Sequence, residues 1–151
     1  MSAVQRDDDW RRHIIDDDEG IDRVIRDTHR IAVLGIKIDP EKPGHYVPAY
    51  AQHAGFEIVP VPVYYPDATE ILGERVYRSL ASVPGDVDMV NVFRRSHDVP
   101  PHLDDILAKK PKSVWLQLGI RNDAAAEILA RAGIDVVQDR CLMIELRHRG
   151  K

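Results

Sequence analysis

The pattern of apolar and polar positions alternates between short apolar runs and segments with helical spacing along most of the chain. Runs rich in Val, Ile and Leu have the length and composition of buried strands. The expected strands cover residues 30–36, 56–61, 87–93, 112–118 and 134–138. The expected helices cover residues 45–54, 101–110, 123–132 and 142–148, and residues 10–28 are expected to form two helices divided near Gly20.

Strands that alternate with helices through short loops favour right-handed crossovers and a parallel sheet. We therefore predict an α/β fold, a Rossmann-like doubly wound three-layer sandwich of about five parallel strands with helices on both faces. Residues 1–16 are expected to form a partly helical N-terminal extension, frayed over 1–8, and residues 17–151 the domain. The long connection 62–86 is expected to be irregular, and Pro48 is expected only within the first turn of its helix.

Composition narrows the functional classes. The chain has 151 residues, enough for one domain, and a net charge of -4, so broad attraction to nucleic acid or to an anionic membrane is not expected. Its single cysteine, Cys141, excludes an internal disulfide and fits a reducing, cytoplasmic compartment. The acidic start is unlike a signal peptide, and no apolar run has the length of a membrane span.

The strongest candidate site follows the first expected strand. That strand ends at Gly35, and a basic loop with Lys37 and Lys42 then leads into a helix. A helix N-terminus presents unpaired N–H groups and a partial positive charge, so the amides near Gly44, His45 and Tyr46 are expected to donate to a phosphate. The glycine spacing differs from G-x-G-x-x-G, and an ordinary solvated turn remains the alternative interpretation.

The end of the second strand argues against a nicotinamide dinucleotide. Such sites place an acidic residue there to bind the ribose hydroxyls. Here residues 61–66 are apolar or aromatic, and the first acid is Asp67. Tyr64 and Tyr65 are interpreted as lid packing in preference to base stacking.

Two further strand ends carry candidate ligand-binding groups. Arg94 and Arg95 follow the third strand, and we expect one to face the site and the other to face solvent or a carboxylate. Gly119, after the fourth strand, allows a ligand to approach the backbone closely, and Asn122 begins a helix directed the same way.

Several segments together resemble one protein family. They are Val33–Ile36, the turn at 40–43, Gly73–Tyr77 with Ser79 and Leu80, Val92–Arg95, Trp115–Ile120 and Asp139–Cys141. In order and spacing they resemble the small single-domain coenzyme A-binding proteins, which are similar in turn to the coenzyme A-binding domain of the succinyl-CoA synthetase alpha subunit. The resemblance covers roughly residues 17–148.

The resemblance implies that coenzyme A is the ligand. It implies that the loop after the first strand binds phosphate and that the ends of the third and fourth strands line the nucleotide and pantetheine path. The expected site comprises Gly35, Ile36, Lys37, Lys42, Pro43, Gly44, His45, Tyr46, Pro62, Val92, Phe93, Arg94, Gln117, Leu118, Gly119 and Asn122. The chain departs from the family pattern at Lys37, at Gly44 and over residues 63–66.

No catalytic or metal-binding set is evident. The seven histidines are scattered, and Cys141 is interpreted as a small buried apolar residue in preference to a nucleophile. We therefore expect a protein that binds coenzyme A or acyl-CoA without catalysis of its own. The alternatives are a coenzyme A-binding subunit of an acyl-CoA-processing enzyme and a nicotinamide dinucleotide-binding oxidoreductase, and a homodimer stays open.

Overall fold

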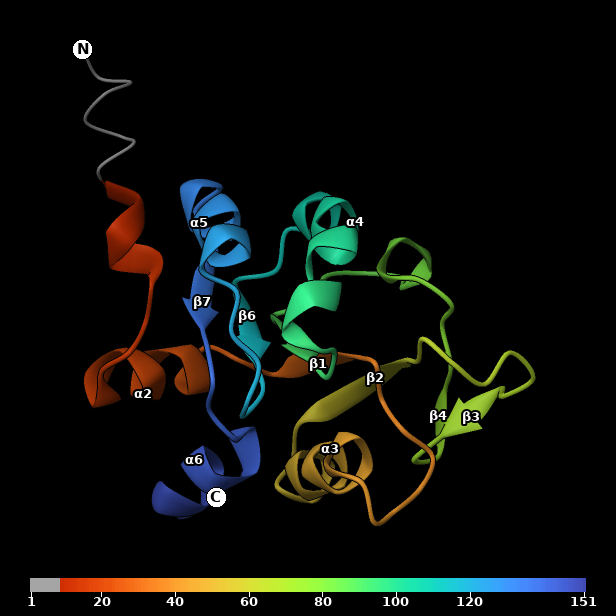
Figure 1. Cartoon of the computed structure of the whole chain (residues 1–151). Coiled ribbons are helices and arrows are strands. Elements are labelled where there is room, and N and C mark those ends of the chain that lie inside the picture. Colours follow the sequence, from red (N-terminus) through yellow and green to blue (C-terminus); the bar gives the residue numbers. More distant parts are fainter. Residues whose placement is uncertain (1–8) are drawn as a thin grey trace.

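The protein, described by a computed structural model over residues 9–151, is built around one parallel β-sheet (Figure 1). The strands of this sheet are β1 (Arg30–Leu34), β2 (Glu57–Val61), β5 (Met89–Val92), β6 (Ser113–Leu116) and β7 (Asp135–Val137). They lie in the order β2-β1-β5-β6-β7, with every neighbour parallel. The winding direction reverses between β1 and β5, the place where ligands bind in open α/β sheets.

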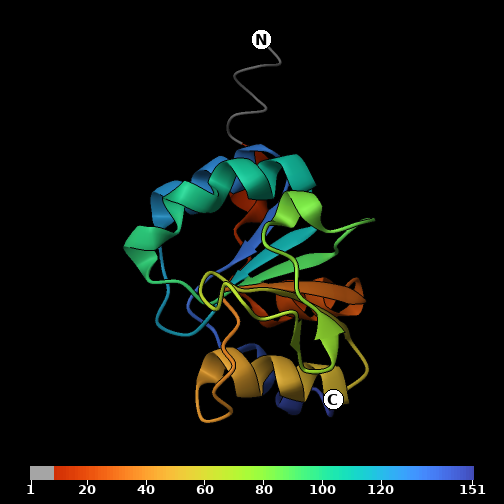
Figure 2. The same cartoon turned by 90° about the vertical axis from the view of Figure 1, so that its right-hand side faces the viewer.

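Helices cover both faces of the sheet, which confirms the predicted Rossmann-like three-layer architecture (Figure 2). One face carries α4 (Leu103–Lys109) and α5 (Asp123–Arg131), and the other carries α2 (Asp18–Arg26), α3 (Pro43–His53) and α6 (Leu142–His148). The short 3-10 helices are η1 (Trp10–His13), η2 (Leu80–Ser82), η3 (Ser96–Asp98) and η4 (Pro100–His102).

Strand β1 shows why the sheet could be predicted. Its side chains alternate between the two cores: Ala32 and Leu34 pack on the α4 and α5 side, whereas Ile31 and Val33 pack on the α3 and α6 side. All four are at most 4% exposed. The sequence of a strand that is buried on both faces is an unbroken apolar run. The observed strands are shorter than predicted at their ends.

The described part of the predicted N-terminal extension lies against the β7 edge of the sheet. Ile14 forms a parallel bridge with Val136, and the Ile15 N–H donates to the Val136 carbonyl at 2.8 Å. His13 Nδ1 lies 2.8 Å from the Asp135 carboxylate. Residues 13–15 therefore pack against the predicted domain, and the division at residue 16 stays a prediction. Residues 1–8, expected to be frayed, lie outside the described residues.

Helix α3 corrects the prediction for Pro48. The helix begins at Pro43, earlier than the predicted residue 45, so Pro48 lies beyond the first turn. A proline there leaves the carbonyl four residues earlier, that of Gly44, without its helical partner. The Lys37 N–H donates to this carbonyl at 3.0 Å. Because a loop amide replaces the missing helical donor, the proline is tolerated.

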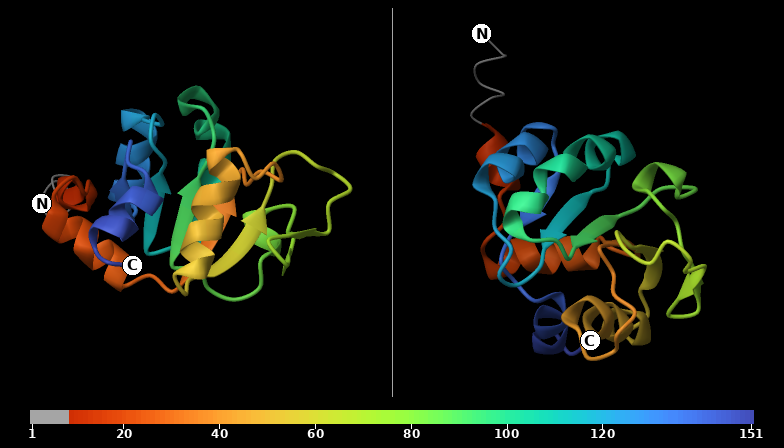
Figure 3. Two further views of the ribbon diagram at one scale, coloured as in Figure 1. Left: turned by 90° about the horizontal axis from the view of Figure 1, so that it is seen from below. Right: turned by 45° about the vertical axis from the view of Figure 1, so that its right-hand side comes forward.

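The connection 62–86 is more ordered than predicted. It forms a short antiparallel hairpin of β3 (Glu70–Ile71) and β4 (Glu74–Arg75), followed by η2, on the β2 side of the sheet (Figure 3). The Arg78 guanidinium donates to three carbonyls of the preceding loop, those of Pro62, Tyr64 and Tyr65, at 3.2, 3.0 and 2.8 Å. These bonds hold residues 62–65 beside the end of β2. Tyr65 lies in the left-handed region of the backbone there, with a φ of 63°.

Candidate functional site

A cleft of about 660 Å³ opens at the carboxyl edge of the sheet, beside the point where the winding reverses. Its walls come from the loop after β1, the start of α3, the loop after β2 and the ends of β5 and β6. The lining residues are Lys37, Lys42, Pro43, Gly44, Tyr64, Phe93, Arg94, Arg95, Ser96, His97, Gln117, Leu118, Gly119 and Ile120. No Asp or Glu stands among these described lining residues, so the cleft is cationic although the chain is acidic overall.

Gly35 allows β1 and β5 to approach closely at their ends. Its φ is +88°, and a Cβ at this position would lie 2.4 Å from the Phe93 carbonyl oxygen. Both neighbours are held by the sheet, because the Gly35 N–H donates to the Val61 carbonyl at 2.9 Å and the Phe93 N–H donates to the Leu34 carbonyl at 2.8 Å. Gly35 is therefore required by backbone packing beneath the cleft.

The first turn of α3 offers fewer free amides than predicted. The N–H groups of His45 and Tyr46 both donate to the Lys42 carbonyl, at 2.9 and 3.0 Å, so the expectation that they bind phosphate is wrong in this structure. Pro43 has no N–H group. Within residues 9–151 the Gly44 N–H has no acceptor, and it remains open to an anion at the positive end of the helix.

His45 positions the basic loop. Its Nδ1 lies 2.8 Å from the Lys37 carbonyl oxygen. A carbonyl can only accept a hydrogen bond, so Nδ1 carries the proton and Nε2 is the free ring nitrogen. Together with the bond from the Lys37 N–H to the Gly44 carbonyl, this contact ties both backbone polar groups of Lys37 to α3. His45 thus supports the site from behind and does not line the cleft.

Arg94 is a largely enclosed cation of the cleft. Its side chain is 16% exposed, and its nearest carboxylate oxygen, on Asp98, lies 3.9 Å from a terminal nitrogen. Its Nε is buried and forms no hydrogen bond with the described residues. Arg95 is 77% exposed and contacts Asp98 at 3.2 Å. The two arginines differ in exposure as predicted, and Arg95 faces solvent and Asp98, but both line the cleft.

Tyr64 lies over the cations. The Lys37 Nζ is 4.5 Å and the Arg94 guanidinium carbon 5.8 Å from the centroid of its ring. Arg94, through hydrogen bonding and through its charge, lowers the pKa of the Tyr64 phenol, and the charge of Lys37 adds to this effect. The ring stands at the cleft with both cations beside it, a position compatible with stacking on a ligand as well as with covering the site.

The titration of Tyr64 is expected to report on the occupancy of the cleft. The two cations favour the phenolate, so the phenol should ionise at lower pH than an ordinary tyrosine. Added diphosphate should reverse this shift, because its negative charge cancels their field. The measurement is the absorbance titration of the wild type minus that of Tyr64→Phe, with and without diphosphate. An unchanged difference curve would show that the anion binds elsewhere.

The end of β6 forms the opposite wall. Leu118 is 62% exposed at the rim, and Gly119 adopts a φ of +85° with its N–H donating to the Asp139 carboxylate at 2.7 Å. Gln117 lines the cleft although it is only 4% exposed. Apolar and amide groups thus continue the cleft away from its cationic end.

Not every predicted site residue reaches the cleft. Ile36 and Val92 are buried in the two cores, and Tyr46 faces a groove between α3 and α6. Asn122 is used structurally: its side chain caps α5 by accepting from the Ala125 N–H at 3.0 Å and donates to the Ser96 carbonyl at 3.0 Å. The predicted residues that do line the cleft are Lys37, Lys42, Pro43, Gly44, Phe93, Arg94, Gln117, Leu118 and Gly119.

The prediction omitted five residues that line the cleft. Tyr64 and Arg95 were candidates outside the predicted set, and Ser96, His97 and Ile120 were also outside it. Three of these directly follow Arg94 and one follows Gly119, so adjacency to predicted residues was the available signal. The Ser96 hydroxyl accepts from the Arg121 N–H at 3.0 Å, and His97 contacts Asp98 at 3.6 Å.

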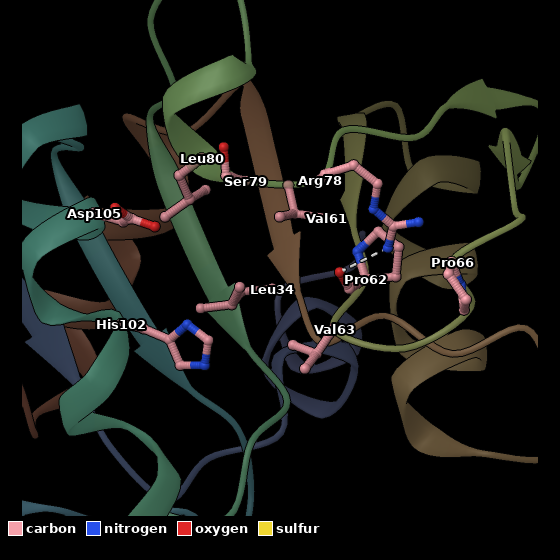
Figure 4. Close-up of a pocket in the computed structure, with 10 residues that line it drawn as sticks. All are labelled: Leu34, Val61, Pro62, Val63, Pro66, Arg78, Ser79, Leu80, His102 and Asp105. Carbon is pink, nitrogen blue, oxygen red and sulfur yellow. Dashed lines mark hydrogen bonds between the residues drawn. The ribbon is translucent and has the colours of Figure 1, made fainter.

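A second, smaller pocket of about 370 Å³ adjoins the cleft above the ends of β1 and β2 (Figure 4). Leu34, Val61 and Val63 form its apolar side, and His102 and Asp105 face them from the α4 layer. Burial lowers the pKa of His102, the charge of Arg94 lowers it further, and Asp105 opposes the shift. Pro62, predicted to bind the cofactor, lines this pocket and not the larger cleft.

Neither a metal site nor a membrane-spanning helix is found in the residues that the structure describes. Over the part of the chain that the structure describes, no group of three or more His, Cys, Asp and Glu side chains is placed to hold a metal ion. None of the helices in residues 9–151 combines the length and apolar character needed to cross a bilayer. Cys141 is 9% exposed, packed among apolar side chains of the α3 and α6 side, and does not line the cleft.

Known proteins are similar to this chain in sequence and in fold. An uncharacterized Bacillus subtilis protein, YneT, is 35% identical over 124 residues, covering 82% of this chain and 90% of its own length. A Thermus thermophilus structure, titled cell-free ID.343, is 38% identical with a TM-score of 0.81, covering 88% of this chain and 98% of that one.

A larger enzyme contains a similar region. The dinucleotide-forming acetyl-coenzyme A synthetase 1 of Ca. Korarchaeum cryptofilum, solved in complex with phosphate and ADP, is 26% identical with a TM-score of 0.59. The match covers 71% of this chain and 25% of that enzyme. The model of the CoA binding domain family matches residues 29–147, over the whole sheet and both cleft walls. The chain therefore belongs to the CoA binding domain family.

Proposed function

We propose that this chain binds coenzyme A or acyl-CoA as a free-standing carrier domain and performs no catalysis of its own. The observation that carries the proposal is the meeting of Lys37, Lys42 and Arg94 in one acid-free cleft where the sheet winding reverses. Family membership supplies the ligand class. A hydrogen bond to a charged group contributes roughly 1.5–3 kcal/mol, so these cations can bind a diphosphate without help from the net charge of the chain.

The adenine of the ligand fits the pocket above β1 and β2. The adenosine is joined directly to the diphosphate, whereas the acyl group lies at the end of the long pantetheine arm. Tyr64 of the cleft and Val63 of the pocket are consecutive residues, so only the nearer, adenosine end is expected to turn into this pocket. Its apolar walls suit a planar base, and Asp105 can accept a hydrogen bond from the exocyclic amine (Figure 4).

The cleft supports binding more than chemistry. Of its lining residues, Ser96 and His97 are the types that form a hydroxyl nucleophile and its base. The Ser96 hydroxyl contacts the Arg121 N–H, and His97, 73% exposed, contacts Asp98, so the pair is not arranged as nucleophile and base.

The alternative is a subunit that holds acyl-CoA for a partner enzyme. It is favoured by the match to a quarter of the acetyl-coenzyme A synthetase, in which a similar region is part of a larger enzyme. Pull-down followed by an acyl-CoA turnover assay separates this alternative from a free-standing carrier.

Calorimetry tests the proposal directly. Coenzyme A and adenosine 3′,5′-diphosphate should both give saturable binding, since both carry phosphate and adenine. NADH also carries adenine and a diphosphate, but it should bind much more weakly, because the end of β2 lacks the acid that binds a ribose diol. Failure of coenzyme A and its dephospho form to bind would refute the assignment, and tight NADH binding would favour an oxidoreductase. Native mass spectrometry of freshly purified protein would identify a ligand that is retained.

A further inference from the structure

Gln117 is a polar side chain in an apolar setting. It is 4% exposed, follows β6, and lies between the cleft and the start of α6. A buried amide must satisfy its donors and its acceptor or destabilise the fold. Its hydrogen bonds therefore indicate what the side chain is held in place to do.

The orientation of the Gln117 amide is determined by its neighbours. The Leu142 N–H, which can only donate, lies 3.3 Å from Gln117 Oε1. The Asn91 amide nitrogen lies 3.4 Å from the same oxygen, and it also donates to the Trp115 carbonyl at 3.2 Å. Both contacts require the oxygen of Gln117 to face the core.

The Gln117 amide nitrogen is a free hydrogen-bond donor at the cleft. Within the described residues Nε2 has no hydrogen-bond partner. It is also absent from the set of side-chain atoms that are fully buried without a partner, which includes Asn91 Oδ1 and Arg94 Nε. The donor is thus fixed in place, unpaired and accessible at the cleft wall.

We propose that Gln117 is a specificity-determining residue that donates a hydrogen bond to an amide carbonyl of the pantetheine arm. This inference rests on the proposed coenzyme A function. The phosphates are expected at the cationic wall, and the arm must then leave along the other wall, past Leu118 and Ile120. The arm carries amide carbonyls between methylene groups, which match one fixed donor within an apolar track. Because the amide is already ordered, little rotamer entropy is lost on binding.

The test compares two ligands that differ by the arm. The Gln117→Met variant loses the N–H donor and nearly keeps the side-chain volume. Calorimetry should show that it binds coenzyme A about tenfold more weakly, a loss of roughly 1.4 kcal/mol in binding free energy. 3′-Phosphoadenosine 5′-diphosphate, which keeps both 5′-phosphates but lacks the arm, should bind as to the wild type. Gln52→Met, at an amide on α3 that donates to the Leu72 carbonyl outside the cleft, should change neither affinity.

Gln117→Glu guards against misfolding, since it keeps the acceptor for the Leu142 N–H and the Asn91 amide. Its negative charge should weaken the binding of both ligands, and the ratio of the two dissociation constants should still shift against coenzyme A. An unchanged ratio in both variants would overturn the inference while leaving the proposed function intact. Wild-type protein that binds neither ligand would overturn both. Acetyl-CoA is titrated as a third ligand. A loss of affinity confined to acetyl-CoA would contradict a contact with an arm amide and assign the contact to the thioester carbonyl.

Discussion

Replacing Arg94 by alanine is expected to weaken coenzyme A binding by about 30- to 100-fold, more than replacing any other single cation of the cleft. Charge-assisted hydrogen bonds from an enclosed guanidinium contribute about 2–3 kcal/mol, which corresponds to this loss. The side chain is 16% exposed and its nearest carboxylate oxygen, on Asp98, lies 3.9 Å away, so its charge is only partly neutralised within the protein. Isothermal calorimetry at fixed ionic strength measures the effect.

Two comparisons isolate the cause of that loss. Arg95→Ala removes the same charge from a side chain that is 77% exposed, and its effect should stay below about threefold, since exposed ion pairs contribute little. Arg94→Lys keeps the charge but loses the planar fork and should fall between the two. Equal losses in Arg94→Ala and Arg95→Ala would contradict the placement of the phosphates, provided that circular dichroism shows both variants folded.

Replacing Gly35 by alanine is expected to lower the free energy of unfolding by more than about 3 kcal/mol, combining left-handed backbone strain of about 1–2 kcal/mol with a severe clash. The added Cβ would meet the Phe93 carbonyl oxygen at 2.4 Å, and hydrogen bonds to β2 and β5 prevent either strand end from yielding. Urea unfolding followed by circular dichroism gives the value.

Gly133→Ala is the matched control for this variant. Gly133 has a φ of +83°, close to that of Gly35, but a Cβ there meets nothing within 4 Å. It should therefore lose only the strain of about 1–2 kcal/mol. Similar losses in the two variants would show that the ends of β1 and β5 can move apart, and the close approach beneath the cleft would then not be a requirement of the fold.

Local sequence patterns were sufficient to predict the strands that are buried on both faces of the sheet. The apolar runs that became β1 and β5 predicted their burial, and Gly35 marked the end of the first strand. Arg94 and Gln117 were predicted as site residues because residues at the carboxyl ends of parallel strands share one edge of the sheet. That rule depends only on strand order and direction.

Other features depended on partners that are distant in sequence. Pro48 was misjudged because its compensation comes from the Lys37 amide of the preceding loop. The His45 and Tyr46 amides are engaged by the early start of α3, and Asn122 is occupied by Ser96 and by its own helix. Tyr64 was interpreted as lid packing, and its contacts with Lys37 and Arg94 could not be read from the sequence.

By itself the sequence determined the α/β architecture and the strand ends that carry the candidate site, because burial and strand direction follow from local periodicity. Only the tertiary structure decided which of those groups remain free for a ligand. A donor such as the Gln117 amide is available or occupied according to what the Leu142 amide and the Asn91 side chain do, and those contacts exist only after the strands and α6 have come together.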